Sequence, residues 1–199
     1  MMIEMKEQAL MILNYTWPIL IIAIIIASSL RIAYLIKQKE KFILHKELFS
    51  LAFIIYVLCL FQAVTFQDVT WSGSNFIPFK EILRYELGSK LFIKNILGNV
   101  LLFFPLGIFI KRYIKIKDIR YVILISFIIS LSIEITQSVI GRVFDVDDIL
   151  LNVIGSLLGF MFFEIIEKIS EKITFIKNDK FLNIVSILAV GGLIWFLIP

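Results

Sequence analysis

The chain has 199 residues, of which 60% are hydrophobic and 18% are charged, with a mean hydropathy of +0.95 and a formal net charge of +4. Several apolar runs are long enough for an α-helix to cross a hydrocarbon core of about 30 Å, which excludes an ordinary soluble domain. Cys59 is the single cysteine and His45 the single histidine, which excludes an intramolecular disulfide and a cysteine-based zinc site. We therefore predict an all-α fold, a polytopic transmembrane helical bundle forming one integral membrane domain over residues 1–199.

Six apolar spans follow one another along the chain, at about 15–36, 48–66, 96–110, 120–140, 149–166 and 181–199. Glu4 and Glu7 precede the first span, so we do not expect it to be a cleaved signal peptide. The third span is short and contains Pro105 and Gly107, so it is expected to be kinked or to cross only in part. The bundle is accordingly predicted to have about five to six spans.

The basic residues predict the orientation of these spans. Thirteen lysines and arginines lie in the first, third and fifth loops, against six at the N-terminus and in the second and fourth loops. Basic residues favour the cytoplasmic side of a membrane. We therefore expect the N-terminus and the loop 141–148 to be extracellular. Basic loops at the inner leaflet account for the positive net charge, so no nucleic acid is expected as a partner.

The long second loop, from Trp71 onward, carries a helical pattern. Apolar residues recur there at helical spacing, with charged residues on the other side: Phe79, Ile82, Leu83 and Leu87 against Lys80, Glu81 and Arg84. The pattern predicts an amphipathic interfacial helix lying on the outer membrane surface. An extracellular helix packed on the bundle is the equal alternative.

Polar side chains gather in and between the fourth and fifth spans. Ionisable groups in such apolar sequence are costly and usually face a protein interior, a cavity or the interface. Helical spacing puts Glu134 and Gln137 on one face of the fourth span, and Asp148 and Asn152 on one face of the fifth. The outer ends of the spans also carry Asn99, Arg142 and Asp145. We therefore expect these groups to meet on one side of the membrane and to form a ligand-binding site.

Purely structural roles compete with that interpretation. Asp147 or Asp148 would suit the N-terminus of the fifth helix as a cap, since acidic groups are favourable there. Glu134 and Arg142 would suit a structural ion pair. Gly155 and Gly159 are expected to let another helix approach closely rather than to contact a ligand.

The carboxylates allow two kinds of chemistry. Clustered carboxylates can hold a divalent cation, which together with Arg142 would suit a phosphate head group. Alternatively, Glu134 could act as a general acid or base. The spacing matches no known metal motif, so we predict no cofactor, with a divalent cation at the cluster as the alternative.

The chain resembles the VanZ-like family of membrane proteins, named for an accessory protein that raises tolerance to the glycopeptide teicoplanin. The matching segments are Asn75 to Phe79, Asn95 to Asn99 with Phe104 to Gly107, Glu134 to Gln137, and Gly141 to Asp148 with Asn152, Gly155 and Gly159. Their order and spacing fit the family over about residues 49–167. The resemblance adds Asn75 and Asn99 to the expected site and implies a bacterial cell-envelope setting.

The resemblance implies no settled activity, so three functions stay open. The first is a membrane protein whose outward polar pocket binds a cell-wall lipid intermediate or glycolipid, or a glycopeptide, and lowers susceptibility to teicoplanin. The second is an intramembrane enzyme acting on a lipid-linked substrate through Glu134, Asp148 and Arg142. The third is a small transporter or a purely structural bundle, for which only the broken pattern of the third span argues. Whether the protein is an enzyme is left open at this stage.

Overall fold

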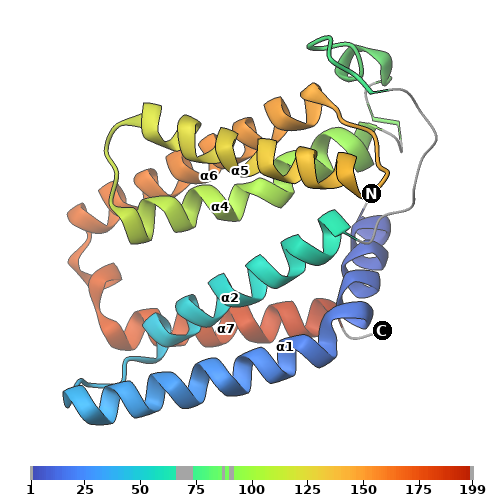
Figure 1. Ribbon diagram of the computed structural model, residues 1–199. Helices are drawn as coiled ribbons and strands as arrows, with labels where there is room; N and C mark the ends of the chain where they lie inside the picture. Colours follow the sequence, from blue (N-terminus) through green and yellow to red (C-terminus); the bar gives the residue numbers. More distant parts are fainter. Residues whose placement is uncertain (1, 66–73, 87, 90–91, 198–199) are drawn as a thin grey trace. The chain divides into compact units, whose positions relative to one another are not determined.

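The computed structural model describes residues 2–65, 74–86, 88–89 and 92–197, and it is helical as predicted (Figure 1). The helices are α1 (Met2–Gln38), α2 (Leu44–Thr65), α4 (Gly98–Ile114), α5 (Ile119–Val139), α6 (Val146–Lys172) and α7 (Asp179–Leu197). Short 3-10 turns occupy Ile82–Arg84 and Thr174–Lys177, and a π-helical turn at Ile93–Leu97 leads into α4. The described residues contain no strand, only an isolated parallel β-bridge between Asn75 and Asp145.

Five helical segments are long and apolar enough to cross a membrane: Leu10–Gln38, Leu44–Thr65, Asn95–Ile114, Ile119–Val139 and Val146–Lys172. The all-α polytopic prediction is thus confirmed, and the chain is a multi-pass membrane protein. The third span, expected to be short, is 20 residues long. Helix α7 coincides with most of the predicted sixth span but is not among the five segments. Residue 66 of the predicted second span and residues 198–199 of the sixth lie outside the described part of the chain.

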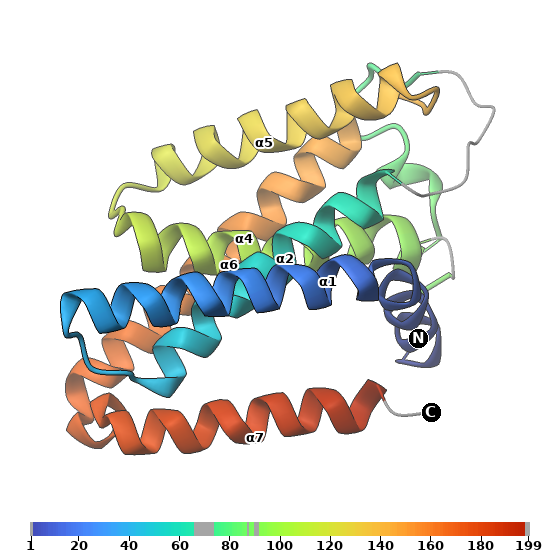
Figure 2. The same cartoon turned by 60° about the horizontal axis from the view of Figure 1, so that its bottom comes forward.

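Contacts divide the chain into two compact units, the first formed by residues 1–63 and 169–199 and the second by residues 64–168. In the first unit, α1 and α2 form a helical hairpin, and α7 belongs to the same unit (Figure 2). Arg31, which lies inside the first predicted span, forms a two-pronged ion pair with Glu47 of α2, at 2.8 and 3.1 Å. The start of α2 is joined to α7 because the backbone N–H of His45 donates to Asn183 Oδ1 at 2.9 Å.

In the second unit, α4 and α6 pack backbone against backbone. A Cβ atom on Gly155 would overlap the carbonyl oxygen of Val100, and one on Gly159 would overlap that of Phe104. Gly107 of α4 makes the reciprocal close approach to α6. Small residues permit such contact between membrane helices. The expectation that Gly155 and Gly159 are packing residues is therefore confirmed.

Helix α5 turns its polar face inward. One buried stripe runs along it at helical spacing, formed by Val122, Ser126, Ser130, Glu134 and Gln137. The Ser126 hydroxyl donates to the Ser156 hydroxyl of α6 at 2.6 Å. Apolar side chains such as Leu124, Phe127 and Ile128 are exposed on the other side. This polar-inside arrangement suits a helix whose outer face meets lipid and whose inner face meets protein.

The expected amphipathic helix in the long loop is reduced to the 3-10 turn Ile82–Arg84. Tyr85 is extended, and Phe79 and Gly88 have positive φ values of 68° and 81°, so the chain turns at each end of this short stretch. The backbone N–H groups at the start of this stretch bind a carboxylate of α6, as described below. Leu87, which completed the sequence pattern, and the loop start at residues 66–73 with Trp71 lie outside the described residues.

Candidate functional site

The end of α5 folds back so that an arginine lies over the helix it follows. Gly141 has φ 87°, the left-handed conformation that favours glycine. The N–H of Arg142 donates to the Gln137 carbonyl at 2.9 Å, and that of Gly141 donates to the Ser138 carbonyl at 3.3 Å, which together form a Schellman cap. The Arg142 guanidinium and the Gln137 amide then both donate to the Val64 carbonyl, at 2.8 and 3.3 Å. A tight turn thus brings two predicted site residues, Gln137 and Arg142, to the end of α2.

Glu134 and Asp145 form the centre of the cluster. Glu134 is only 2% exposed, and its Oε2 accepts the backbone N–H of Asp145 at 3.0 Å. Asp145 Oδ1 accepts the Asn75 amide at 2.9 Å and the backbone N–H of Asp147 at 2.8 Å. The second of these bonds makes Asp145 the N-cap of α6, a role expected of Asp147 or Asp148.

Asn75 fastens the long loop to the segment before α6. Its backbone N–H donates to the Phe144 carbonyl at 2.8 Å, and its own carbonyl accepts the N–H of Val146 at 3.0 Å. Its side-chain oxygen accepts the N–H of Ile77 at 3.1 Å. Through these contacts Asn75 fixes the long loop against the segment before α6.

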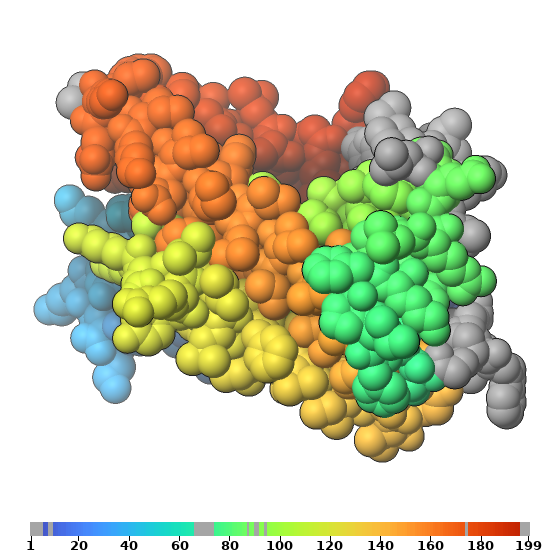
Figure 3. Space-filling model, turned by 90° about the horizontal axis from the view of Figure 1, so that it is seen from above, coloured from blue at the N-terminus to red at the C-terminus, as the bar shows by residue number. Residues whose placement is uncertain are grey.

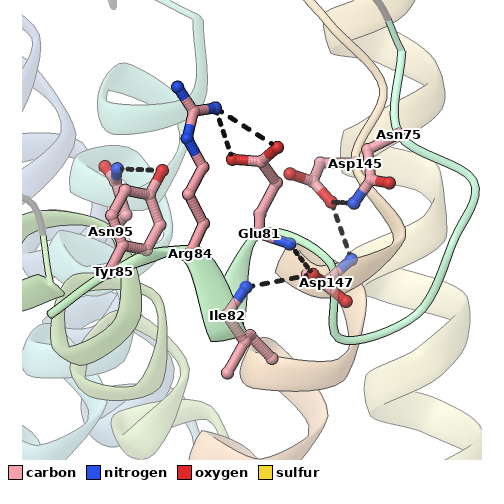
Figure 4. A network of polar contacts seen from close by, with 8 residues as sticks. All are labelled: Asn75, Glu81, Ile82, Arg84, Tyr85, Asn95, Asp145 and Asp147. Atoms are coloured by element: carbon pink, nitrogen blue, oxygen red, sulfur yellow. Dashed lines mark hydrogen bonds and ion pairs between the residues drawn. The ribbon is translucent and has the colours of Figure 1, made fainter.

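Asp147 holds the rest of the loop (Figure 4). It is only 1% exposed, and it accepts the backbone N–H groups of Phe79, Glu81 and Ile82, the last two at 2.8 and 3.2 Å. Three donors on one carboxylate fix the loop beside the start of α6. Asp147 is absent from the predicted site, because a carboxylate near a helix start also suits a simple cap.

Asp148 and Asn152 continue the cluster along α6. Asp148 Oδ1 accepts the amide of Asn99, which joins the starts of α4 and α6. One turn deeper, the Asn152 amide donates to the Ser130 hydroxyl of α5 at 2.9 Å. Asn152 is 4% exposed, and its Oδ1 is the single buried side-chain nitrogen or oxygen among the described residues that has no hydrogen-bond partner. The cluster therefore contains a buried acceptor that is not satisfied.

The cluster is acidic and partly desolvated. Burial lowers the pKa of the Arg142 guanidinium, and the negative charges of Glu134 and Asp148 oppose that shift, so both carboxylates lie within electrostatic range of one cation. Burial raises the pKa of the Asp145 carboxyl, while the hydrogen bonds from Asn75 and from the Asp147 backbone lower it. One arginine thus faces several carboxylates in a low-dielectric environment.

The described residues contain no group of three or more His, Cys, Asp or Glu side chains placed to hold a metal ion. The carboxylate oxygens instead accept N–H groups of the backbone and of side-chain amides.

The structure brings all the predicted residues to one end of the second unit, in three connected groups. Asn75, Asp145 and Glu134 form the first, Asn99 and Asp148 the second, and Gln137 and Arg142 the third, while Asn152 lies one turn deeper. Sequence reasoning missed Ser126, Ser130 and Ser156. The spacing of four residues between Ser130 and Glu134, and between Asn152 and Ser156, was a usable signal.

The chain was compared with known proteins. The family model VanZ/LLP1 matches residues 48–167, more than half of the chain and nearly the 49–167 core expected from the resemblance. No curated protein and no solved structure matches the chain. The matched region includes every residue of the cluster described above. The chain belongs to the VanZ/LLP1 family.

Proposed function

We propose that the acidic cluster is the head-group site of a membrane protein that binds a cell-wall lipid intermediate or a glycolipid-type ligand on the outer side of a bacterial cell membrane. The observation that carries the proposal is the convergence of Glu134, Asp148 and Arg142 within electrostatic range of one another at one end of three membrane helices. Ionisable groups in such helices are costly and are typically kept for function.

The balance of donors and acceptors points to the class of ligand. Carboxylates outnumber the arginine, and Asn152 Oδ1 is a further acceptor without a partner. A ligand rich in hydroxyl or amide donors, such as a sugar head group, complements this arrangement better than a bare phosphate, which brings only acceptors. Arg142 supplies the one cation that an acidic substituent on such a ligand would need.

The loop beside the cluster suits the membrane interface. Its side chains Phe76, Ile77, Phe79 and Leu83 are exposed. Apolar side chains next to a polar cluster are expected where head groups meet acyl chains. The excess of basic residues at the other ends of the helices supports placing this end outside, with the N-terminus and the loop 141–148 extracellular.

Binding is tested by mass spectrometry of the purified protein with a polyprenyl-linked sugar. We expect Glu134→Gln and Asp148→Asn each to weaken retention of the lipid about tenfold, since a charge-assisted hydrogen bond is replaced by a neutral one. Glu171→Gln, an exposed carboxylate at the end of α6, is the matched control and should bind as wild type. Equal retention by all four proteins would contradict the proposal.

The resistance part of the proposal has its own test. Strains with the gene deleted or overexpressed are compared for inhibitory concentrations of teicoplanin and vancomycin. We expect overexpression to raise the teicoplanin value and Glu134→Gln to abolish that rise. If the inhibitory concentration of neither drug changes, the protein is not a resistance determinant. Lipid binding is tested separately, by the mass spectrometry experiment.

An intramembrane enzyme is the second candidate, favoured by the same pairing of two carboxylates with Arg142. The purified protein is incubated with polyprenyl-pyrophosphate and glycolipid substrates, with and without Mg²⁺. Turnover that disappears in Glu134→Gln and Asp148→Asn would assign acid–base chemistry to these groups. Binding without turnover would leave the non-enzymatic proposal in place.

A further inference from the structure

The other end of the second unit holds a basic cavity. It has a volume of about 340 Å³ and lies between the end of α4, the loop that follows it, and α6. Six side chains line it: Lys111, Arg112, Lys115, Lys117, Phe163 and Glu167. In Figure 3 the yellow-green end of α4 lies beside the orange residues of α6. Four cations against one carboxylate make the lining strongly positive.

The inner wall of the cavity is rigidly organised. Lys111 is buried, and its Nζ lies 3.8 Å from Glu164 Oε2, 3.7 Å from Glu167 Oε2 and 4.8 Å from the centroid of the Phe160 ring. Lys168 Nζ also pairs with Glu164, at 2.8 Å. The two glutamates of α6 thus hold the buried lysine in place while the other cations of the cavity approach from α4 and its loop.

The outer wall is built by a sharp turn after α4. Lys115 has φ 55° and caps the helix by donating its N–H to the Lys111 carbonyl at 3.1 Å, so the chain reverses and carries Lys117 back toward the cavity. Both lysine side chains are exposed, and among the described residues neither forms an ion pair. Their charges are therefore available to an anion.

We propose that this cavity binds a phosphate-bearing anion, either the head group of an anionic phospholipid or free phosphate. The candidate spans on either side end at Ile114 and begin at Ile119, so the cavity lies at the membrane boundary, where head groups are found. Its volume is about ten times that of a water molecule, roughly 30 Å³ in the liquid, which leaves room for a phosphate and a small esterified alcohol. Arg112 and the lysines supply charge, and Phe163 supplies an apolar wall for a glycerol backbone.

The first arm of the test uses a lipid probe. The full chain is placed in nanodiscs that contain phosphatidylcholine and phosphatidylglycerol, and the lipids retained on release are weighed by native mass spectrometry. We expect the wild type to retain phosphatidylglycerol in preference to phosphatidylcholine. In Lys115→Gln/Lys117→Gln, the ratio of the two retained lipids should fall about tenfold. Lys177→Gln/Lys180→Gln, which removes the same charge from two exposed lysines beyond α6, should retain it. Lys117→Gln alone should show an intermediate loss.

The second arm distinguishes the two sources of phosphate. Inorganic phosphate is followed by ³¹P NMR line broadening with the protein in phosphatidylcholine nanodiscs. Broadening by wild type but not by Lys115→Gln/Lys117→Gln, without phosphatidylglycerol retention, identifies free phosphate, and the reverse pattern identifies a lipid head group. The proposal is overturned if neither probe binds, or if the Lys177 and Lys180 control loses as much as the cavity variant. Unchanged unfolding temperatures of these exposed-lysine variants confirm that folding is not the cause.

Discussion

The two ends of the second unit use charge differently. At the Asp145 end, four carboxylates accept hydrogen bonds from backbone and amide N–H groups. At the Lys111 end, two of the four cations that line the cavity are exposed and form no ion pair among the described residues. Helices α4 and α6 extend to both ends. The difference is that backbone N–H groups approach the acidic end from a folded loop, while the basic end is closed only by a short turn.

This contrast separates two uses of charge in one membrane bundle. Buried carboxylates that bind N–H groups fix the local fold whether or not they also contact a ligand, so removing one should change stability. Exposed cations around a cavity contribute little to folding, so removing one should change ligand binding. Between the two ends lies a tightly packed seam of glycines and serines. The following substitutions are ordered by the size of the stability change expected from this picture.

The largest effect is expected for Asp147→Ala. The change leaves the N–H groups of Phe79, Glu81 and Ile82 without their shared acceptor, and we expect the free energy of unfolding to fall by about 3 kcal/mol. It is measured by denaturant titration in mixed micelles. Glu171→Ala, at an exposed position, serves as the control and should change little. A loss below about 1 kcal/mol would show that Asp147 does not hold the loop.

The second-largest loss of stability is expected in the packed seam between α4 and α6. In Gly159→Ala the new methyl group would overlap the Phe104 carbonyl, and the unfolding free energy should fall by about 2 kcal/mol because helix backbones cannot yield as a flexible side chain can. Gly191→Ala is the matched control, since a Cβ there meets nothing within 4 Å. Equal stability of the two variants in the same titration would contradict the close approach of α4 and α6.

A smaller effect is expected at the basic end. Lys111→Met keeps the volume but removes the pairing with Glu164 and Glu167, and because both glutamates are partly exposed we expect a loss of only about 1 kcal/mol. Lys115→Met should change stability by less than about 0.5 kcal/mol. If Lys115→Met is the more destabilising variant, the exposed cations take part in folding and the contrast between the two ends fails.

A small coupling is also expected between the two hydroxyl groups inside the seam. Ser126→Ala and Ser156→Ala remove one interhelical hydrogen bond, and a double-mutant cycle should give a coupling of about 0.6 kcal/mol, typical of such bonds between membrane helices. Ser132→Ala is a suitable comparison, because its exposed hydroxyl bonds only within α5. Zero coupling between Ser126 and Ser156 would show that backbone packing alone holds α5 against α6.

Much of the candidate site follows from helical spacing. Glu134 and Gln137 share a face of α5, and Asp148 and Asn152 share one of α6, because residues three and four apart lie on the same side of a helix. Polar groups in an apolar span must turn inward, which brings the two faces together. Spacing could not reveal the Val64 carbonyl as a shared acceptor, because every residue has a carbonyl group.

The long loop shows where pattern reasoning fails. The spacing of Phe79, Ile82 and Leu83 is that of an amphipathic helix, yet only one 3-10 turn forms. A short helix in a loop gains little from its own hydrogen bonds. The N–H groups of Glu81 and Ile82, at the start of the turn, bind the buried Asp147, far along the chain. This tertiary acceptor fixes the start of the turn, while Leu83 and Arg84 keep turn bonds to Phe79 and Glu81.

The sequence by itself determined the membrane class, five of the six spans, the inward faces of α5 and α6 and the close packing at Gly155 and Gly159, because each depends on hydropathy or on spacing within one helix. Only the tertiary structure decided that Asp147 binds the loop before α4, and that the cations after α4 surround a cavity with α6. These features depend on which backbone groups approach from distant segments, and that information is not carried by the residue types of any single segment.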